Sequence, residues 1–160
     1  MISAPLGDSS PNSRALALTD AAATEALGAR LGAQMRAGDV ICLSGELGAG
    51  KTSLARGAIR VWTGSDEEAP SPTYTLVQTY DGAKGQLLHC DLYRLKSADE
   101  ALEIGVADAF GSAACLVEWP ERLGEALPRE RLEIALSFEG EGRRALLTGH
   151  GQWRARLDAI

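Results

Sequence analysis

The spacing of apolar residues along the chain predicts helices and strands in alternation. Apolar side chains recur every fourth position within residues 18–39, which predicts a helix whose N-cap is Thr19 or Asp20. The run VICLS at residues 40–44 is almost entirely apolar, which is typical of a strand buried in a sheet. A second amphipathic run, KTSLARGAIRVW at residues 51–62, predicts another helix. Strand and helix therefore alternate in the first part of the chain.

Hairpin patterns dominate the second half. Two strand-like runs, YTLVQTY (74–80) and GQLLHCDLY (85–93), flank DGAKG, and two more, RLEIALSFE (131–139) and RRALLTGH (143–150), flank GEG. Short glycine-containing loops between such runs predict antiparallel hairpins. SADEALEIG predicts a helix with Ser97 and Glu100 as a capping box, AACLVEW predicts an apolar strand, and GQWRARLDAI predicts a short helix or a frayed end. We expect an α/β fold in which helices flank a mixed, partly antiparallel sheet.

Length, composition and charge narrow the possibilities further. The 160 residues suit one domain, and we expect a disordered tail over residues 1–14 followed by a single domain over 15–160. No apolar run approaches the ~20 residues of a membrane span, and the start lacks a signal-peptide pattern, so we expect a cytoplasmic protein without membrane contact. The net charge of −6 argues against tight autonomous binding to RNA or DNA. Cys42, Cys90 and Cys115 share no metal-ligand spacing and are expected to be buried thiols in a reducing compartment.

The strongest chemical signal is GELGAGKT at residues 45–52, which fits G-x-x-x-x-G-K-[ST] at every fixed position. The glycines allow successive N–H groups to point at phosphate oxygens, and the following helix adds its partial positive charge. Lys51 is expected to reach the β- and γ-phosphates, and the Thr52 hydroxyl to bind Mg²⁺. A glycine-rich turn with an incidental lysine is the alternative, and the flanking strand and helix argue against it. We therefore expect a single P-loop NTPase domain.

The nucleotide and the metal partners follow from other segments. The chain has no Asn-Lys-x-Asp run for reading guanine, so ATP is favoured over GTP. A magnesium-dependent NTPase needs a carboxylate at the end of a neighbouring strand, and Asp91 and Glu118 both follow apolar runs. Thr73, in SPTYT, could place a hydroxyl near Mg²⁺ or the γ-phosphate, although an ordinary turn is the simpler interpretation. The predicted nucleotide contacts are Gly45, Glu46, Leu47, Gly48, Ala49, Gly50, Lys51, Thr52, Ser53, Trp119 and Arg143.

The roles of four further residues follow less directly from the motifs. Trp119 adjoins Glu118, so contact with the nucleotide or a partner is expected in addition to packing. Arg143 follows the GEG turn and is the only internal candidate for an arginine finger, because no arginine adjacent to the other motifs is an evident one. His89 alternates with apolar residues and is interpreted as a core histidine with satisfied hydrogen bonds. His150 has no functional signal.

Four segments in this order and spacing, GELGAGKTSLARG, SPTYTLVQTY, HCDLYRL and LVEWPERL, resemble the bacterial TsaE (YjeE) family over residues 18–147. That family is the ATPase of tRNA threonylcarbamoyladenosine biosynthesis. The resemblance implies that the segment from Thr19 to Ala21 approaches the adenine, where Ala21 replaces a commonly acidic residue. By position it assigns phosphate and Mg²⁺ contacts to Lys51 and Thr52, a switch-like hydroxyl to Thr73, metal-side or water-positioning carboxylates to Asp91 and Glu118, and the nucleotide or partner edge to Trp119.

The resemblance also implies partners. Family members act with TsaD and TsaB, which transfer threonylcarbamoyl to the adenosine beside the anticodon, and ATP hydrolysis resets that assembly between turnovers. The tRNA would be contacted only indirectly through the complex, in agreement with the acidic charge. Two alternatives stay open. A small-molecule kinase would need an acceptor pocket and a basic lid, but residues 62–71 are acidic; a nucleotide-sensing module would not need Asp91 and Glu118.

Overall fold

A computed structural model describes residues 13–65 and 76–160 of the chain. Its seven-stranded sheet has the order β1-β7-β6-β2-β5-β4-β3. The strands are β1 (Ser13–Leu18), β2 (Val40–Ser44), β3 (Val77–Gly82), β4 (Gly85–Asp91), β5 (Ala114–Glu118), β6 (Arg131–Glu139) and β7 (Gly142–His150). The helices are α1 (Ala21–Gln34), α2 (Lys51–Thr63), α3 (Ala98–Glu103), α4 (Val106–Ala109) and α5 (Trp153–Arg156), with the 3₁₀ helices η2 (Pro120–Ala126) and η3 (Leu157–Ala159).

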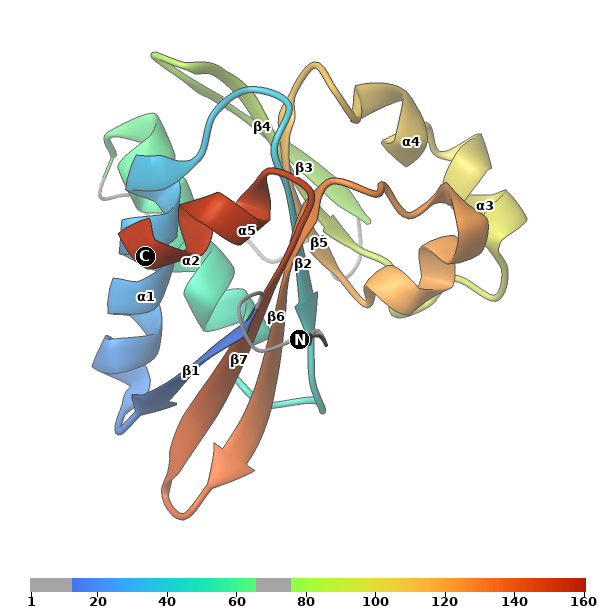
Figure 1. The fold of residues 1–160 in the computed structure, drawn as a ribbon. Coiled ribbons are helices and arrows are strands. Elements are labelled where there is room, and N and C mark those ends of the chain that lie inside the picture. The colour runs from blue at the N-terminus through green and yellow to red at the C-terminus, as the bar shows by residue number, and fades with distance from the viewer. Residues whose placement is uncertain (1–12, 66–75) are drawn as a thin grey trace, which may run out of the picture.

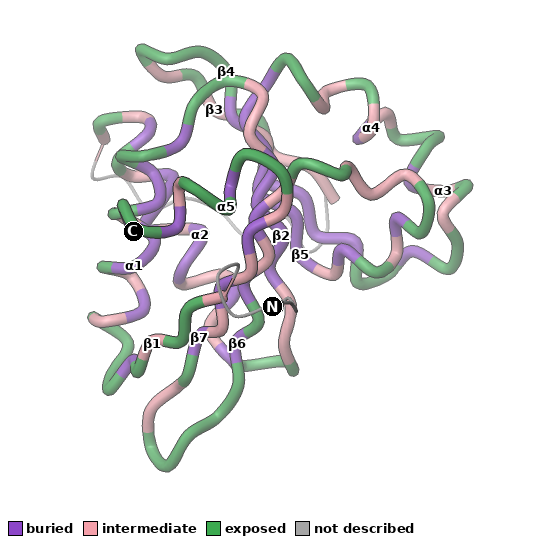
Figure 2. The backbone as a smooth tube through the Cα atoms, in the orientation of Figure 1, coloured by how far each residue is buried: buried purple, intermediate pink, exposed green. Residues whose placement is uncertain are grey.

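The sheet is mixed, because β6, β2, β5 and β4 run parallel to one another whereas β3, β7 and β1 pair antiparallel. Helices α1, α2 and α5 lie on one side of it, and α3, α4 and η2 lie on the other (Figure 1). The side chains of β2 alternate accordingly: Ile41 and Leu43 belong to one core cluster, and Val40 and Cys42 to the other. Burial is concentrated in the central strands β2 and β5 (Figure 2). The α/β class predicted from the sequence is confirmed.

Helix α1 packs directly on α2. Asp20 caps α1, since its side chain accepts from the Ala23 N–H at 2.8 Å, and the helix ends at Gln34, earlier than the sequence indicated. A Cβ atom at Gly28 would overlap the carbonyl oxygen of Leu54 in α2. Glycines at positions 32 and 57 meet the opposite backbone in the same way. The absence of side chains at these points lets the two backbones touch.

The turn between β3 and β4 holds the other end of α1. The Lys84 ammonium donates to the carbonyl oxygens of Gly32 and Ala33 at 3.2 and 3.3 Å and also to that of Met35. It lies 4.9 Å from the centroid of the Trp62 ring in α2. A cation at a helix C-terminus is favourable, so this lysine stabilises the joint between hairpin and helix pair.

Most predicted elements are confirmed, and their boundaries show where the sequence pattern was incomplete. Both hairpins form, although the first begins only at Val77; residues 74 and 75 lie outside the described part. Ser97 caps α3, but the Glu100 carboxylate accepts from the Lys96 N–H instead of closing the capping box. Strand β1 was not predicted: it pairs with β7 from Ser13 onward, so residues 13 and 14, which were assigned to the tail, belong to this strand. Among residues 13–65 and 76–160, every helix lacks the combination of length and apolar composition that a membrane span needs.

Candidate nucleotide-binding site

Three neighbouring parallel strands bring the candidate residues to one end of the sheet. Glu118, at the end of β5, is level with Leu43 of β2 and with Asp91 of β4. The loop after β2 therefore opens beside both predicted carboxylates, at the edge where ligands of open α/β sheets bind. The start of α1 and the tip of the β6–β7 hairpin lie at this same end (Figure 1).

Glycines at positive φ shape the loop between β2 and α2. Gly45, Gly48 and Gly50 have φ values of 138°, 83° and 108°, which side chains disfavour. At Gly45 a Cβ atom would also overlap the carbonyl oxygen of Leu136. Helix α2 begins at Lys51, and its N-cap Gly50 supplies no side-chain acceptor to the first-turn N–H groups. These N–H groups and the helix dipole can therefore bind an anion such as a phosphate.

The Lys51 side chain folds back over this loop. Its ammonium donates to the carbonyl oxygens of Gly45 at 2.6 Å and Glu46 at 3.0 Å and lies 4.7 Å from the centroid of the Trp119 ring. Burial lowers the pKa of Lys51, and nearby carboxylates, Glu118 most strongly, oppose that shift. The loop thus holds a partly desolvated cation next to the first turn of α2, where a phosphate group would be bound.

Glu118 is almost completely buried, at 2% exposure, and has two side-chain partners. The Thr52 hydroxyl lies 3.3 and 3.4 Å from its two carboxylate oxygens, and His89 Nε2 lies 2.6 Å from Oε2. His89 is buried as expected, but its interpretation as a satisfied core histidine was wrong. One ring nitrogen contacts a candidate catalytic carboxylate, and the other, Nδ1, has no hydrogen-bond partner among the described residues.

Thr52, Glu118 and Asp91 offer the oxygen donors that Mg²⁺ prefers. One oxygen of the buried Asp91 carboxylate already accepts from the Tyr93 N–H at 3.1 Å. In the part of the chain that the structure describes, no group of three or more His, Cys, Asp or Glu side chains is arranged to hold a metal by itself. A magnesium ion here would accordingly need phosphate oxygens and water in addition to Thr52 and a carboxylate, which is its usual coordination.

A cavity of about 320 Å³ joins these groups. Its lining comprises Leu47, Gly48, Gly50, Lys51, Thr52, Ser53, Asp91, Tyr93, Arg94, Glu118 and Trp119. Arg94 and Tyr93 were missed by sequence reasoning, although both lie in the segment DLYRL directly after Asp91. Because Arg94 lines this cavity, it is a second internal candidate for an arginine finger beside Arg143, which was the only one that the sequence indicated.

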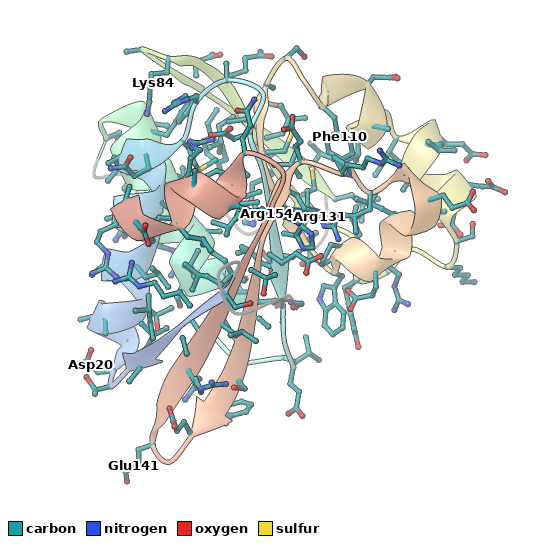
Figure 3. The ribbon with its side chains drawn as sticks, viewed as in Figure 1. Asp20, Lys84, Phe110, Arg131, Glu141 and Arg154 are labelled. Atoms are coloured by element: carbon teal, nitrogen blue, oxygen red, sulfur yellow. The ribbon has the colours of Figure 1, made fainter. Side chains whose placement is uncertain are left out.

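A second cavity, of about 450 Å³, lies on the other side of the loop. It shares Gly48, Gly50 and Ser53 with the first, and the start of α1 and the turn after β6 complete its lining, with Thr19, Asp20, Ala21, Thr24, Glu141, Gly142 and Arg143. Arg143 belongs here and donates to the Gly48 carbonyl oxygen at 3.1 Å. Figure 3 labels two of these residues at this end of the molecule: Asp20 at the start of α1 and Glu141 in the turn between β6 and β7. One extended ligand could therefore contact both cavities across the loop.

The backbone changes conformation sharply at Trp119, directly after the end of β5. Its φ of 61° and ψ of 53° are left-handed, which is uncommon for a residue with a side chain. Its ring lies 4.8 Å from that of Tyr93, centroid to centroid, and both line the first cavity. Aromatic side chains thus form one wall of the cavity beside Lys51.

The remaining predicted residues take different positions. Ala49 is fully buried and its N–H donates to the Glu46 carbonyl oxygen at 3.0 Å, whereas Leu47 is 64% exposed at the cavity rim. Thr73 lies outside the described residues, so its expected role stays a prediction. The three cysteines are buried free thiols, as predicted.

Comparison with protein families gives one match over most of the chain. The family model described as "Threonylcarbamoyl adenosine biosynthesis protein TsaE" matches residues 18–146.

Individual relatives agree with this match. The protein named tRNA threonylcarbamoyladenosine biosynthesis protein TsaE from Rickettsia bellii is 36% identical over 112 residues, which cover 70% of this chain and 78% of that protein. The Bacillus subtilis protein of the same name is 36% identical over 124 residues, 77% of each chain. Among solved structures, the crystal structure of Bacillus subtilis YdiB superposes with a TM-score of 0.72 at 30% identity and covers 91% of both chains.

Proposed function

The chain belongs to the TsaE family, and we propose that it is an ATP-hydrolysing component of tRNA threonylcarbamoyladenosine biosynthesis. The pathway is proposed from the names of its relatives. The chemistry is proposed from the site: a loop whose N–H groups and lysine suit phosphates, next to a buried carboxylate.

The observation that supports hydrolysis best is the contact between Thr52 and Glu118. A hydroxyl at the start of α2 lies 3.3 Å from a carboxylate at the end of the adjacent strand. This is the juxtaposition that a magnesium-dependent NTPase requires. Bound Mg²⁺, held by Thr52 with Glu118 or Asp91, would neutralise charge on the phosphates. Glu118 would orient the attacking water, and Lys51 would bind the β- and γ-phosphates.

We assign the phosphates to the first cavity and the nucleoside to the second. The shared residues Gly48, Gly50 and Ser53 lie between the two, where a phosphate chain would pass. The preference for ATP over GTP rests on the missing guanine-reading motif. Arg143, which lines the second cavity, would contact the nucleoside side of the ligand.

The proposed partners are the TsaD and TsaB proteins, on which ATP hydrolysis would act as a reset between turnovers. The rim of the first cavity presents Leu47 and Tyr93, which are 64% and 40% exposed. A partner that covered this rim would exclude water and strengthen the electrostatic interactions inside. We therefore propose slow hydrolysis alone and faster hydrolysis in the complex. Contact with tRNA would occur through the complex, and the location would be the cytoplasm, where such a complex would work.

Steady-state phosphate release tests the proposal. The purified chain is assayed with Mg²⁺ and ATP, alone and with the TsaB–TsaD pair from the same organism. We expect low turnover alone and a large increase in the mixture, which Lys51→Ala abolishes. Equal rates with and without the pair would refute partner activation. Transfer of phosphate to a metabolite instead of water would favour the kinase alternative, and binding without turnover in either case would favour the sensing module.

A further inference from the structure

His89 and Glu118 form a buried pair behind the phosphate cavity. Their side chains meet at 2.6 Å, between Nε2 and Oε2, and the residues are only 1% and 2% exposed. Glu118 lines the cavity and His89 does not, so the histidine lies behind the carboxylate. A contact this short in a water-poor setting fixes the relative orientation of the two groups.

The strand register explains why these side chains meet. His89 of β4 is level with Leu116 of β5, and Asp91 is level with Glu118. Side chains two residues apart in a strand share a face, so all four point to the side of the sheet that α2 covers. The Glu118 carboxylate contacts His89, the residue diagonally opposite on β4, through Oε2, and both of its oxygens lie within 3.4 Å of the Thr52 hydroxyl.

We propose that His89 is a positioning residue for Glu118. The Nε2–H group donates to Oε2, and this bond holds the carboxylate beside the Thr52 hydroxyl, which lies 3.3 Å from Oε1 and 3.4 Å from Oε2. The effect of this bond on turnover rests on the proposed function, in which Glu118 acts in ATP hydrolysis; the bond itself does not.

The hydrogen-bond partners of the His89 ring indicate which of its nitrogens carries the hydrogen. Nδ1 is without a hydrogen-bond partner among the described residues, whereas Nε2 faces a carboxylate, which can only accept when ionised. The tautomer with hydrogen on Nε2 is therefore the one that satisfies the carboxylate. A buried carboxylate deprived of its donor would lose both solvation and orientation.

Kinetics with matched variants test the role. His89→Leu removes the donor and His89→Gln places an amide N–H near the position of Nε2; both are assayed with the partner pair, alongside His150→Gln. His150 is the matched control, because it lies 3.3 Å from Glu133 in a second, half-exposed histidine–glutamate pair away from the cavities. Loss of an outer contact of this kind costs roughly 10- to 100-fold in activity. We expect that loss in kcat for His89→Leu, with KM for ATP nearly unchanged, substantial recovery in His89→Gln, and wild-type rates for His150→Gln.

A double variant separates positioning from stability. In the Glu118→Gln background, His89→Leu should reduce kcat no further, since the group that it orients has already lost its function. A further loss of similar size in that background, or equal defects in His89→Leu and His89→Gln, would overturn the proposal. Circular dichroism establishes that each variant is folded, and if His89→Leu is not, the measurement below decides.

Nuclear magnetic resonance tests the bond without any need for activity. The chain contains two histidines, so ¹⁵N-histidine labelling of His150→Gln leaves His89 as the sole signal. We expect hydrogen on Nε2, in a downfield proton resonance that moves upfield on Glu118→Gln. Hydrogen on Nδ1 alone, or a resonance unchanged by Glu118→Gln, would overturn the proposal even if ATP hydrolysis is established. The expected resonance in a chain that hydrolyses no ATP would support the pair and leave only the proposed function refuted.

Discussion

Replacing Lys51 with alanine should weaken ATP binding by about two to three orders of magnitude. In the free protein the Lys51 ammonium is already buried and bound to two loop carbonyls, so its position need not change much when a phosphate binds. A unit charge about 4 Å from a phosphate oxygen contributes roughly 4 kcal/mol at an effective dielectric constant of about 20. Water entering the vacated space recovers part of this, whereas Glu118 and Asp91 then repel the phosphates without compensation. We expect a net loss of about 3–4 kcal/mol, which is about 100- to 1,000-fold in Kd.

The chain contains a close chemical match for use as the control. Lys84 also donates to backbone carbonyls and lies 4.9 Å from a tryptophan ring, compared with 4.7 Å for Lys51, but it lies at the end of α1 away from both cavities. Titration with a fluorescent ATP analogue should give the wild-type Kd for Lys84→Ala, although its melting temperature falls. An unchanged Kd for Lys51→Ala, or an equal loss in both variants, would refute the electrostatic reasoning.

Four further outcomes are expected. Arg94→Ala should lower kcat in the complex by at least tenfold with little change in ATP affinity if this internal arginine stabilises the transition state, and unchanged phosphate release would assign that task to a partner. Gly28→Ala should reduce the free energy of unfolding by about 1–3 kcal/mol in urea titrations, because overpacking outweighs the gain in helix propensity. The three cysteines should react with a thiol reagent only after denaturation, since burial raises their pKa values. Partial burial raises the pKa of Glu133, but Arg131 and His150 lower it by more, so Glu133→Gln should reduce the melting temperature at pH 7; the difference should shrink as the pH falls below about 4.3 and vanish only below the lowered pKa of Glu133.

The sequence predicted the elements whose pattern is local and missed features that depend on neighbouring strands. The loop at residues 45–52 carries its own geometry in its glycines, so its position between a strand and a helix was predictable. Strand β1 was missed because its run SRALAL is only six residues long and lies between a polar segment and the helical pattern that begins at Leu18. Its identity as a strand comes from pairing with β7, a contact more than a hundred residues away.

The candidate site divides in the same way. Asp91 and Glu118 were identifiable because they end apolar runs, and the structure brings both to the cavity. The contact between His89 and Glu118 was not predictable, since it depends on the register of β4 against β5 and on the direction in which a long side chain turns. Arg94 was overlooked because the strand-like run was expected to continue to Tyr93, whereas β4 ends at Asp91, whose carboxylate accepts from the Tyr93 N–H, and Arg94 lines the cavity.

The glycine contact between α1 and α2 has a consequence for ligand choice. Asp20 and Thr24 at the start of α1 line the second cavity, and the first turn of α2 lines the first cavity. The packing of α1 on α2 therefore sets the distance between the two cavities. Because the two backbones touch at Gly28, the distance between α1 and α2 is fixed by close packing, and Gly28 itself lines neither cavity. A methyl group at position 28 should increase the distance between the two helices, and with it the distance between the two cavities. Selectivity for the span of a nucleoside triphosphate would then change with the base-contacting and phosphate-contacting residues all intact.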